Sequence, residues 1–285
     1  MNQRLQLPEK FFRLAAWGSA GLSLLILVFM LILGRPLLGH DLFALVFHQP
    51  WQPDRQLYGL FPMLVGTLAV STTALLMALP LAFGTAILAA IIRPGGCGRL
   101  LVRIVQLLTG MPTVVYGFVG IFLLVPRLRT LFGGGSGRSI LAAALMLALL
   151  ITPTMVLIFI DSFQRVPRGW QTAAAALGCT PMQTFRHVIL PRAAGGLLSG
   201  TILAFGRAVG DTMIALMLAG NAVAVPCSLL DPARTLTSQI ALVFAADFSS
   251  LEFKSIFLCG LILYLLTSTL TIALRLARPT VGYQP

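Results

Sequence analysis

An arginine and an aspartate lie within a long apolar stretch, in the run at residues 206–213. Their spacing predicts that Arg207 and Asp211 share one face of a helix. A charged side chain in a bilayer costs from about 3 to more than 10 kcal/mol, so it normally faces a partner group or an aqueous path. The guanidinium group of arginine is planar and can donate two parallel N–H hydrogen bonds to an oxyanion. The pair predicts an anion-binding gate, or else an ion pair that only fixes helix packing beside Gly206 and Gly210.

Three hydroxyl groups extend the predicted substrate path. Thr212 directly follows the aspartate, and Thr113 and Tyr116 follow the helix-breaking Pro112. A hydroxyl within a membrane span needs a hydrogen-bond partner. We therefore expect these side chains to line the path or its closure.

Composition indicates a membrane protein. Of the 285 residues, 58% are hydrophobic and 10% are charged, whereas soluble domains carry about 25% charged residues. The net charge is +12, but the basic residues form short clusters between apolar runs, which is typical of membrane topology signals rather than of nucleic-acid binding. The four cysteines are far apart and indicate neither a disulfide framework nor a metal site.

Six apolar runs are long enough to cross a bilayer, which takes about 20 residues of helix. They are residues 14–33, 60–92, 100–126, 139–160, 193–220 and 255–277. Because they lack the alternation of a transmembrane barrel, they predict an all-α membrane protein. The first run is longer than the apolar core of a signal peptide, so we expect an uncleaved helix.

The distribution of Arg and Lys predicts that both termini are cytoplasmic. Arg127, Arg129 and Arg138 oppose this bias, because they fall on a predicted external loop. We divide the chain into an N-terminal transmembrane helix with its external loop, residues 1–59, and a core of five transmembrane helices, residues 60–280. The core contains a long cytoplasmic loop at residues 161–192.

This cytoplasmic loop has its own pattern. An alanine-rich run at residues 172–177 precedes Gly178, and a second amphipathic piece at residues 184–190 ends at Pro191. The pattern predicts two short helices separated by a tight glycine turn at the membrane surface. The chain has no phosphate-binding G-x-x-x-x-G-K-[ST] loop and no recognisable catalytic group, so any ATP hydrolysis must belong to another chain.

The spacing in this loop resembles a motif of ABC importer permeases, which reads E-A-A, three residues, G, nine residues, I-x-L-P. The matching residues are Ala173, Ala174, Gly178, Val188, Leu190 and Pro191. In that family the loop docks into an ATPase subunit. Thr172 stands where the family has glutamate, so the resemblance implies docking without the ion pair that a glutamate could make.

Residues 206–213 resemble the G-R-A-I-G-E-T-M signature of phosphate-specific ABC permeases, with Asp211 in place of the glutamate. Residues 51–68, 110–118 and 218–221 and a segment before the last helix extend the resemblance to the C-type subunit, over about residues 50–277. The resemblance implies the type I importer fold in a bacterial inner membrane. It also implies inorganic phosphate as substrate, a second related permease, two ATP-binding subunits and a periplasmic phosphate-binding protein.

Other functions stay open on the sequence alone. A sulfate or molybdate permease is disfavoured because phosphate near neutral pH keeps a proton to donate to Asp211, whereas sulfate has none and would be repelled. A proton-driven transporter would use Asp211 as carrier, but we see no internal repeat. A non-conducting regulatory scaffold is the remaining alternative, since Thr172 and Asp211 both depart from the family motifs.

Overall fold

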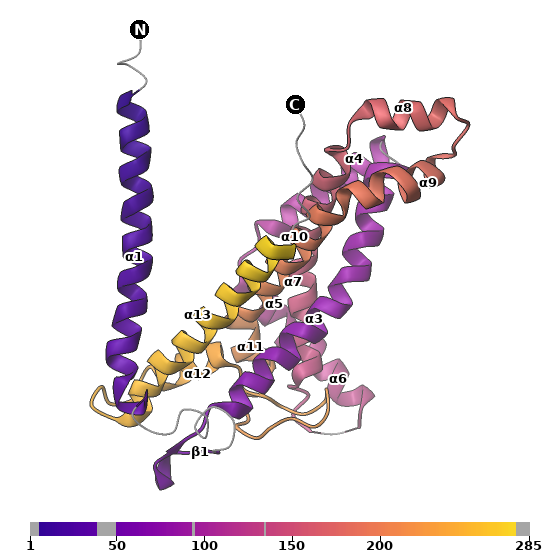
Figure 1. Ribbon diagram of the computed structural model, residues 1–285. Helices are drawn as coiled ribbons and strands as arrows, with labels where there is room; N and C mark the ends of the chain where they lie inside the picture. The colour runs from indigo at the N-terminus through magenta and orange to yellow at the C-terminus, as the bar shows by residue number, and fades with distance from the viewer. Residues whose placement is uncertain (1–5, 39–49, 93–94, 134, 278–285) are drawn as a thin grey trace.

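The computed structural model describes residues 6–38, 50–92, 95–133 and 135–277 (Figure 1). The predicted all-α class is confirmed, and in these ranges six helical stretches are long and apolar enough to span a membrane. They are Phe12–Leu37, Phe61–Ile92, Thr113–Leu131, Ile140–Gln164, Pro181–Val209 and Leu251–Ala273. Residues 1–5, 39–49 and 278–280 of the predicted domains lie outside the described residues, so the division at residue 59 stays a prediction.

Helix α7 (Ile140–Gln164) is the centre of the bundle, and α3 (Phe61–Ile87) packs along it. The contact face of α3 presents an alanine every fourth residue, which puts small side chains in one stripe and lets two helices approach closely. These fully buried alanines are Ala74, Ala78, Ala82 and Ala86. A π-helical turn, η2 (Leu88–Ile92), extends α3.

Helix α10 (Leu190–Val209) also packs on α7 through small residues. A Cβ atom added at Gly200 would lie 2.9 Å from the Ile158 side chain, and one at Gly196 would overlap Ser162. Glycine is therefore required for the distance between these two helices. This contact fixes the position of the functional residues near the end of α10.

Helix α1 (Gln6–Leu38) leaves the bundle, and Figure 1 shows it meeting α13 (Leu251–Ala277) at one end and diverging at the other. Phe29 and Phe257 make an edge-to-face contact with ring centroids 5.8 Å apart. The end of the bundle near β1 (Trp51–Gln52) is here called the β1 end, and the end near α8 (Arg168–Ala176) the α8 end. Strand β1 pairs antiparallel with β2 (Leu57–Tyr58) across the turn η1 (Pro53–Arg55).

The predicted span at residues 100–126 is wrong as a single helix. An amphipathic helix, α4 (Gly96–Thr109), ends before Gly110, and α5 (Thr113–Val119) begins a new helix that continues through η3 (Gly120–Leu124) and α6 (Val125–Leu131). Pro112 has an extended backbone, with φ −60° and ψ 140°. Because proline has no N–H to donate and restricts the residue before it, the Gly-Met-Pro sequence separates the two helices.

The predicted span at residues 193–220 is also wrong at both ends. Its helix starts earlier and is continuous from α9 (Pro181–Thr184) through the π-helical η4 (Phe185–Ile189) into α10. Pro191 therefore does not end a helix: the continuous stretch runs through it directly after the π-helical turn η4, where the regular i−4 hydrogen-bond pattern is already interrupted. At the other end α10 stops at Val209, and α11 (Met213–Leu218) starts anew.

The β1 end is closed by the segment after α11 and by α12 (Leu236–Val243). Ala233 donates its N–H to the Ala219 carbonyl at 2.7 Å, and the Ser139 N–H donates to the Leu218 carbonyl at 2.9 Å. A Cβ atom added at Gly66 of α3 would overlap the Arg234 carbonyl. Helix α11 packs against α5 and α7, and these contacts hold the break after α10 in place.

Candidate substrate path and coupling segment

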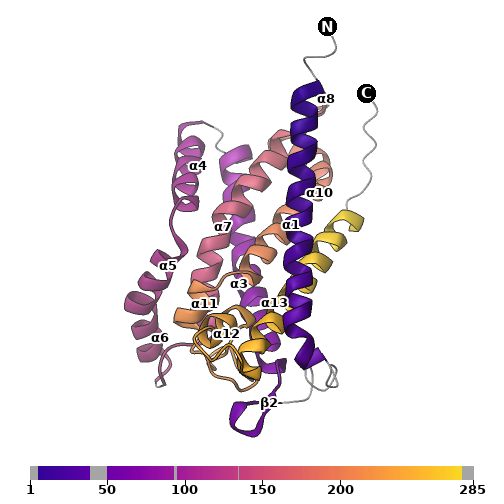
Figure 2. The same ribbon diagram turned by 90° about the vertical axis from the view of Figure 1, so that its left-hand side faces the viewer.

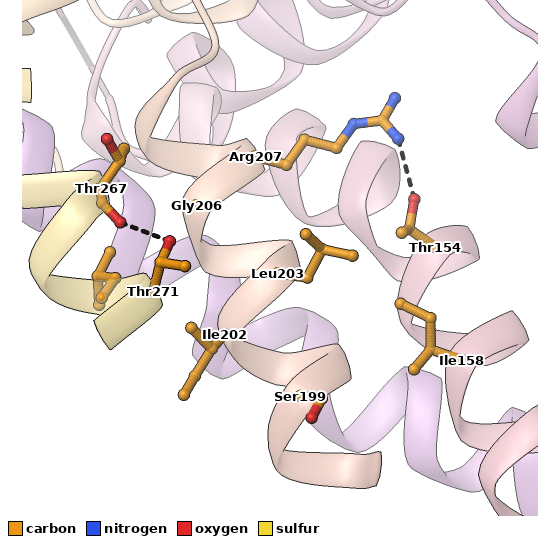
Figure 3. Close-up of a pocket in the computed structure, with 10 residues that line it drawn as sticks. Thr154, Ile158, Ser199, Ile202, Leu203, Gly206, Arg207, Thr267 and Thr271 are labelled. Carbon is orange, nitrogen blue, oxygen red and sulfur yellow. Dashed lines mark hydrogen bonds between the residues drawn. The ribbon is translucent and has the colours of Figure 1, made fainter. Parts of the chain in front are cut away.

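Arg207 lies in the last turn of α10, within the membrane-spanning part of the bundle. Its side chain is exposed, and Figure 3 shows it extending from α10 toward α7. Its Nη1 donates to Thr154 Oγ1 of α7 at 2.9 Å. A guanidinium has five N–H donors, and no other hydrogen bond or ion pair of this side chain is present in the described part of the protein. Most of its donors are therefore free for a ligand.

Asp211 lies in the break between α10 and α11 and is 9% exposed. Its Oδ2 accepts the Ile214 N–H at 2.9 Å, and the Ala215 N–H also faces the carboxylate. The hydroxyl of Thr237 in α12 donates to the Asp211 backbone carbonyl at 2.8 Å. The aspartate thus caps the start of α11, where unpaired N–H groups and the helix dipole stabilise a negative charge.

The prediction that Arg207 and Asp211 share one helix face is wrong, because α10 ends between them. The Gly210 N–H closes the last turn by donating to the Gly206 carbonyl at 3.1 Å. The aspartate side chain then takes the N–H of Ile214 and begins a new helix. No ion pair joins Arg207 to Asp211 among the described residues, although the two charges lie within electrostatic range.

A cavity of about 770 Å³ runs along α10 between α7 and α13, with Arg207 among its lining residues (Figure 3). Ser199, which also lines it, lies two turns earlier on α10, so the cavity extends from the guanidinium toward the α8 end. The α13 side contributes Thr267 and Thr271. Arg207 is the one ionisable group among the lining residues that the structure describes, so an anion in this cavity would bind there.

Three of the four hydroxyls that line this cavity are hydrogen-bonded to helix carbonyls. Ser199 donates to the Gly195 carbonyl at 2.8 Å, and Thr271 donates to the Thr267 carbonyl at 2.8 Å. Thr267 in turn donates to the Leu263 carbonyl at 2.9 Å. Having used their protons, these hydroxyls present only acceptor lone pairs to a ligand. The arrangement combines one strong donor group with several acceptors.

The other predicted path residues have separate surroundings. Tyr116 is buried, and its hydroxyl donates to the Leu108 carbonyl at 3.1 Å across the break between α4 and α5. It also lies within electrostatic range of Arg207. Thr113 is half-buried at the start of α5, and Thr212 is half-buried at the start of α11. None of the three lines the cavity beside α10, and their place on the path stays a prediction.

The predicted loop at residues 161–192 contains the first short helix, α8, and the glycine turn as expected, but its second helix is not separate, because α9 continues through η4 into α10. Its glycine turn is a Schellman motif, in which the Gly178 N–H donates to the Ala175 carbonyl at 3.0 Å and the Cys179 N–H to the Ala174 carbonyl at 3.1 Å. Gly178 has φ +81°, a left-handed conformation that favours glycine. Thr180 and Gln183 then form a capping box that begins α9.

The motif positions in this loop differ in exposure. Ala174 lies on the buried face of α8, whereas Ala173 and Thr172 on the same helix are exposed. The Thr172 hydroxyl donates to the Gly169 carbonyl at 2.9 Å, so it bonds within its own helix. Further along, Leu190 is half-buried and Pro191 is exposed in the first turn of α10.

The apolar surface of this segment lies at the turn. Leu177 is 85% exposed and Met182 is 53% exposed. The Arg192 guanidinium stacks on the Trp170 ring at 4.0 Å from its centroid, which joins α8 to α10. The turn is therefore connected to α10 both through α9 and η4 and through this stacking contact.

Sequence reasoning missed two groups that position the site, Thr154 and Thr237. The one sequence feature that could have indicated Thr154 is that it places a hydroxyl group within an apolar span, which the structure shows to be the most buried of the six. Arg234 is a further missed residue, with Nη1 donating to Gln239 Oε1 at 2.9 Å. Burial lowers the pKa of Arg234 and the Glu252 carboxylate raises it, and the guanidinium stays charged.

The capping role of Asp211 predicts a difference between two substitutions. Asp211→Ala should lower the free energy of unfolding by about 1–2 kcal/mol, because the N–H groups of Ile214 and Ala215 lose their acceptor. Asp211→Asn should cost much less, since an amide oxygen still caps the helix. Thermal unfolding of the two purified variants in one detergent measures this, and equal loss in both would contradict the capping role.

Comparison with known proteins identifies a family that shares this sequence and fold. Residues 82–278 match the family described as "Binding-protein-dependent transport system inner membrane component". The chain is 33% identical over 244 residues to the phosphate transport system permease protein PstC of Mesorhizobium japonicum, covering 79% of this chain and 75% of that protein. It is 33% identical over 219 residues to the probable ABC transporter permease protein YqgH of Bacillus subtilis, covering 76% and 71%.

Among solved structures, a bacterial ABC transporter involved in the import of alginate has a similar fold, with a TM-score of 0.59 at 14% identity over 97% of this chain and 99% of that one. At this identity the likeness concerns the fold alone. The family match covers more than half of the chain and includes the segment at residues 161–192, here called the coupling segment after the role that the family resemblance implies, as well as Arg207 and Asp211. The chain therefore belongs to the inner-membrane component family of binding-protein-dependent transport systems and is a multi-pass ABC importer permease, not itself an enzyme.

Proposed function

We propose that the chain conducts inorganic phosphate as one permease of an ATP-driven importer. The observation that carries the proposal is the guanidinium of Arg207, which Thr154 holds from one side at a membrane-embedded cavity while most of its donors stay free. An anion that leaves water needs such donors to replace its hydration. Relatives named as phosphate permeases support the choice of anion.

The acceptors around the cavity favour an anion that carries a proton. Phosphate near neutral pH retains at least one proton and can donate to the hydroxyl oxygens of Ser199, Thr267 or Thr271, whereas sulfate cannot. An anion without a proton leaves these acceptor oxygens unpaired, so the site binds it less tightly than an anion that can donate a hydrogen bond. The buried Asp211 carboxylate adds repulsion that is stronger toward a dianion such as sulfate than toward the monoanion H₂PO₄⁻. In this proposal Asp211 acts as a selectivity element and not as a direct partner of Arg207.

The assembly that we propose contains a second related permease, two ATP-binding subunits and a periplasmic phosphate-binding protein. The α8 end would face the cytoplasm, where Leu177 and Met182 give an ATPase subunit an apolar contact. The first turn of α1 and the last turn of α13 lie toward that end (Figure 1), which supports cytoplasmic termini. ATP would be hydrolysed by the partner subunits, and this chain would hold no cofactor.

Uptake into vesicles that contain the complete importer tests the proposal. We expect ATP-dependent accumulation of labelled phosphate and no accumulation of sulfate. Asp211→Asn should raise sulfate uptake relative to phosphate by about tenfold, because the repelling charge is gone while the helix cap remains. Wild-type protein in the same vesicles is the control.

Three other results would each assign a different function. Preferential uptake of sulfate or molybdate would change the substrate. Phosphate uptake driven by a proton gradient without ATP would indicate a secondary transporter. A complete importer that assembled but moved no anion would leave the scaffold role.

A further inference from the structure

Helix α4 presents two adjacent stripes to its surroundings. Leu100, Ile104 and Leu107 form an apolar stripe, with exposed fractions of 58%, 46% and 75%. Arg99 and Arg103 form a second stripe one residue earlier on the helix, and both side chains are exposed. Residues spaced by three or four positions share a helix face. The helix therefore places cations beside an apolar surface along its length.

The cationic stripe opens into a pocket of about 430 Å³ between α4, the turn η2 and α7. Arg99, Arg103 and Gln106 line one wall, and Asp161 and Gln164 of α7 line the other. Neither arginine side chain has a hydrogen bond or an ion pair within the described ranges of the chain. The pocket thus contains two guanidinium groups whose donors are not used by the protein.

The acidic residue in this pocket is already neutralised. Asp161 Oδ2 accepts from Arg165 Nε and Nη2, each at 2.8 Å. Its charge therefore does little to cancel the field of Arg99 and Arg103. The amides of Gln106 and Gln164 add neutral donors on both walls. The pocket as a whole suits an anionic group.

The position of the pocket indicates where such an anion comes from. At a rise of about 1.5 Å per residue, Arg99 lies about 5 Å and Arg103 about 11 Å along α4 from its first residue, Gly96. Figure 2 shows this start of α4 toward the α8 end of the bundle. With the α8 end at the cytoplasmic face, arginines this close to the end of the bundle would lie at the level of lipid headgroups.

We infer that the pocket between α4 and α7 binds the phosphate of an anionic phospholipid in the cytoplasmic leaflet, with an acyl chain along the stripe of Leu100, Ile104 and Leu107. The two stripes match the two parts of one lipid molecule, since a free anion would use the arginines and leave the apolar stripe unexplained. The lipid would also contact the last turn of α7, which leads into α8. The inference rests on the proposed orientation of the bundle but not on the transported anion.

Native mass spectrometry of the complete importer with added phosphatidylglycerol tests the inference. Each arginine near an anionic lipid surface contributes a factor of about five in binding. Arg99→Gln/Arg103→Gln should therefore weaken phosphatidylglycerol binding about thirtyfold and leave phosphatidylcholine binding unchanged. Arg99→Lys/Arg103→Lys should retain most of the affinity because it keeps both charges.

The matched control is Arg127→Gln/Arg129→Gln on α6, which removes the same charge outside the pocket and should leave phosphatidylglycerol binding unchanged. Equal affinity in the pocket variant and in the wild type would overturn the inference. Displacement of phosphatidylglycerol from the wild type by inorganic phosphate would also overturn it, by making the pocket a site for the free anion. Phosphate uptake is a separate measurement, so failure here leaves the proposed function intact.

Discussion

Replacing Arg207 with glutamine is expected to reduce phosphate uptake by about a hundredfold or more while the importer still assembles. Removing one charge from a close pair, here the guanidinium and the bound anion, lowers the binding free energy by about 2–5 kcal/mol. Among the described residues around the cavity, no other cation can replace it. Glutamine keeps an N–H₂ donor for Thr154 but not the positive charge. Uptake of labelled phosphate into vesicles measures the loss, and size-exclusion chromatography checks assembly.

Two further variants separate the charge from its position. Arg207→Lys keeps the charge but loses the planar fork, so uptake should fall by about tenfold. Thr154→Val removes the hydroxyl that Nη1 binds at 2.9 Å and leaves the cation in place, so its effect should be smaller than that of Arg207→Gln. This order of effects is specific to an anion-binding role. Uptake at the unmodified rate in Arg207→Gln would make the arginine a structural residue of helix packing.

The parts of this protein that are local in sequence could be predicted from it. Apolar length predicted the six spans, and the position of Gly178 after an alanine run predicted the turn between α8 and α9. Both depend on interactions within a few residues, such as the left-handed φ of Gly178 and the bonds that close the Schellman motif. For these features, interactions between residues close in sequence were sufficient for a correct prediction.

The break between α10 and α11 could not be predicted in the same way. Hydropathy is continuous across residues 193–220, but the Asp211 carboxylate takes the Ile214 N–H and the Thr237 hydroxyl holds the Asp211 carbonyl. Thr237 is distant in sequence, so a spacing of four residues wrongly suggested a pair on one helix. The partner of Arg207 lies on another helix for the same reason. Such contacts require the packed bundle.

The coupling segment leads to the second large effect. Gly178→Val should uncouple ATP hydrolysis from phosphate uptake. A β-branched residue at φ +81° is strained by about 1–3 kcal/mol or more, so the turn should rearrange and change the angle between α8 and α9. An added Cβ atom meets nothing within 4 Å, so the effect would come from the backbone and not from a clash. The exposed Leu177 beside it would then no longer be presented to an ATPase subunit in the same way.

Gly178→Asn is the matched control, because asparagine adopts the left-handed conformation more readily than other residues with side chains. We expect the asparagine variant to keep most of its uptake and the valine variant to lose at least about tenfold, with ATPase activity that no longer responds to phosphate and its binding protein. Measuring both activities in the same vesicles separates uncoupling from unfolding, since an unfolded permease would not bind the ATPase subunits at all. If Gly178→Val kept both normal uptake and normal stimulated hydrolysis, the turn would not transmit the motion of the ATPases to α10.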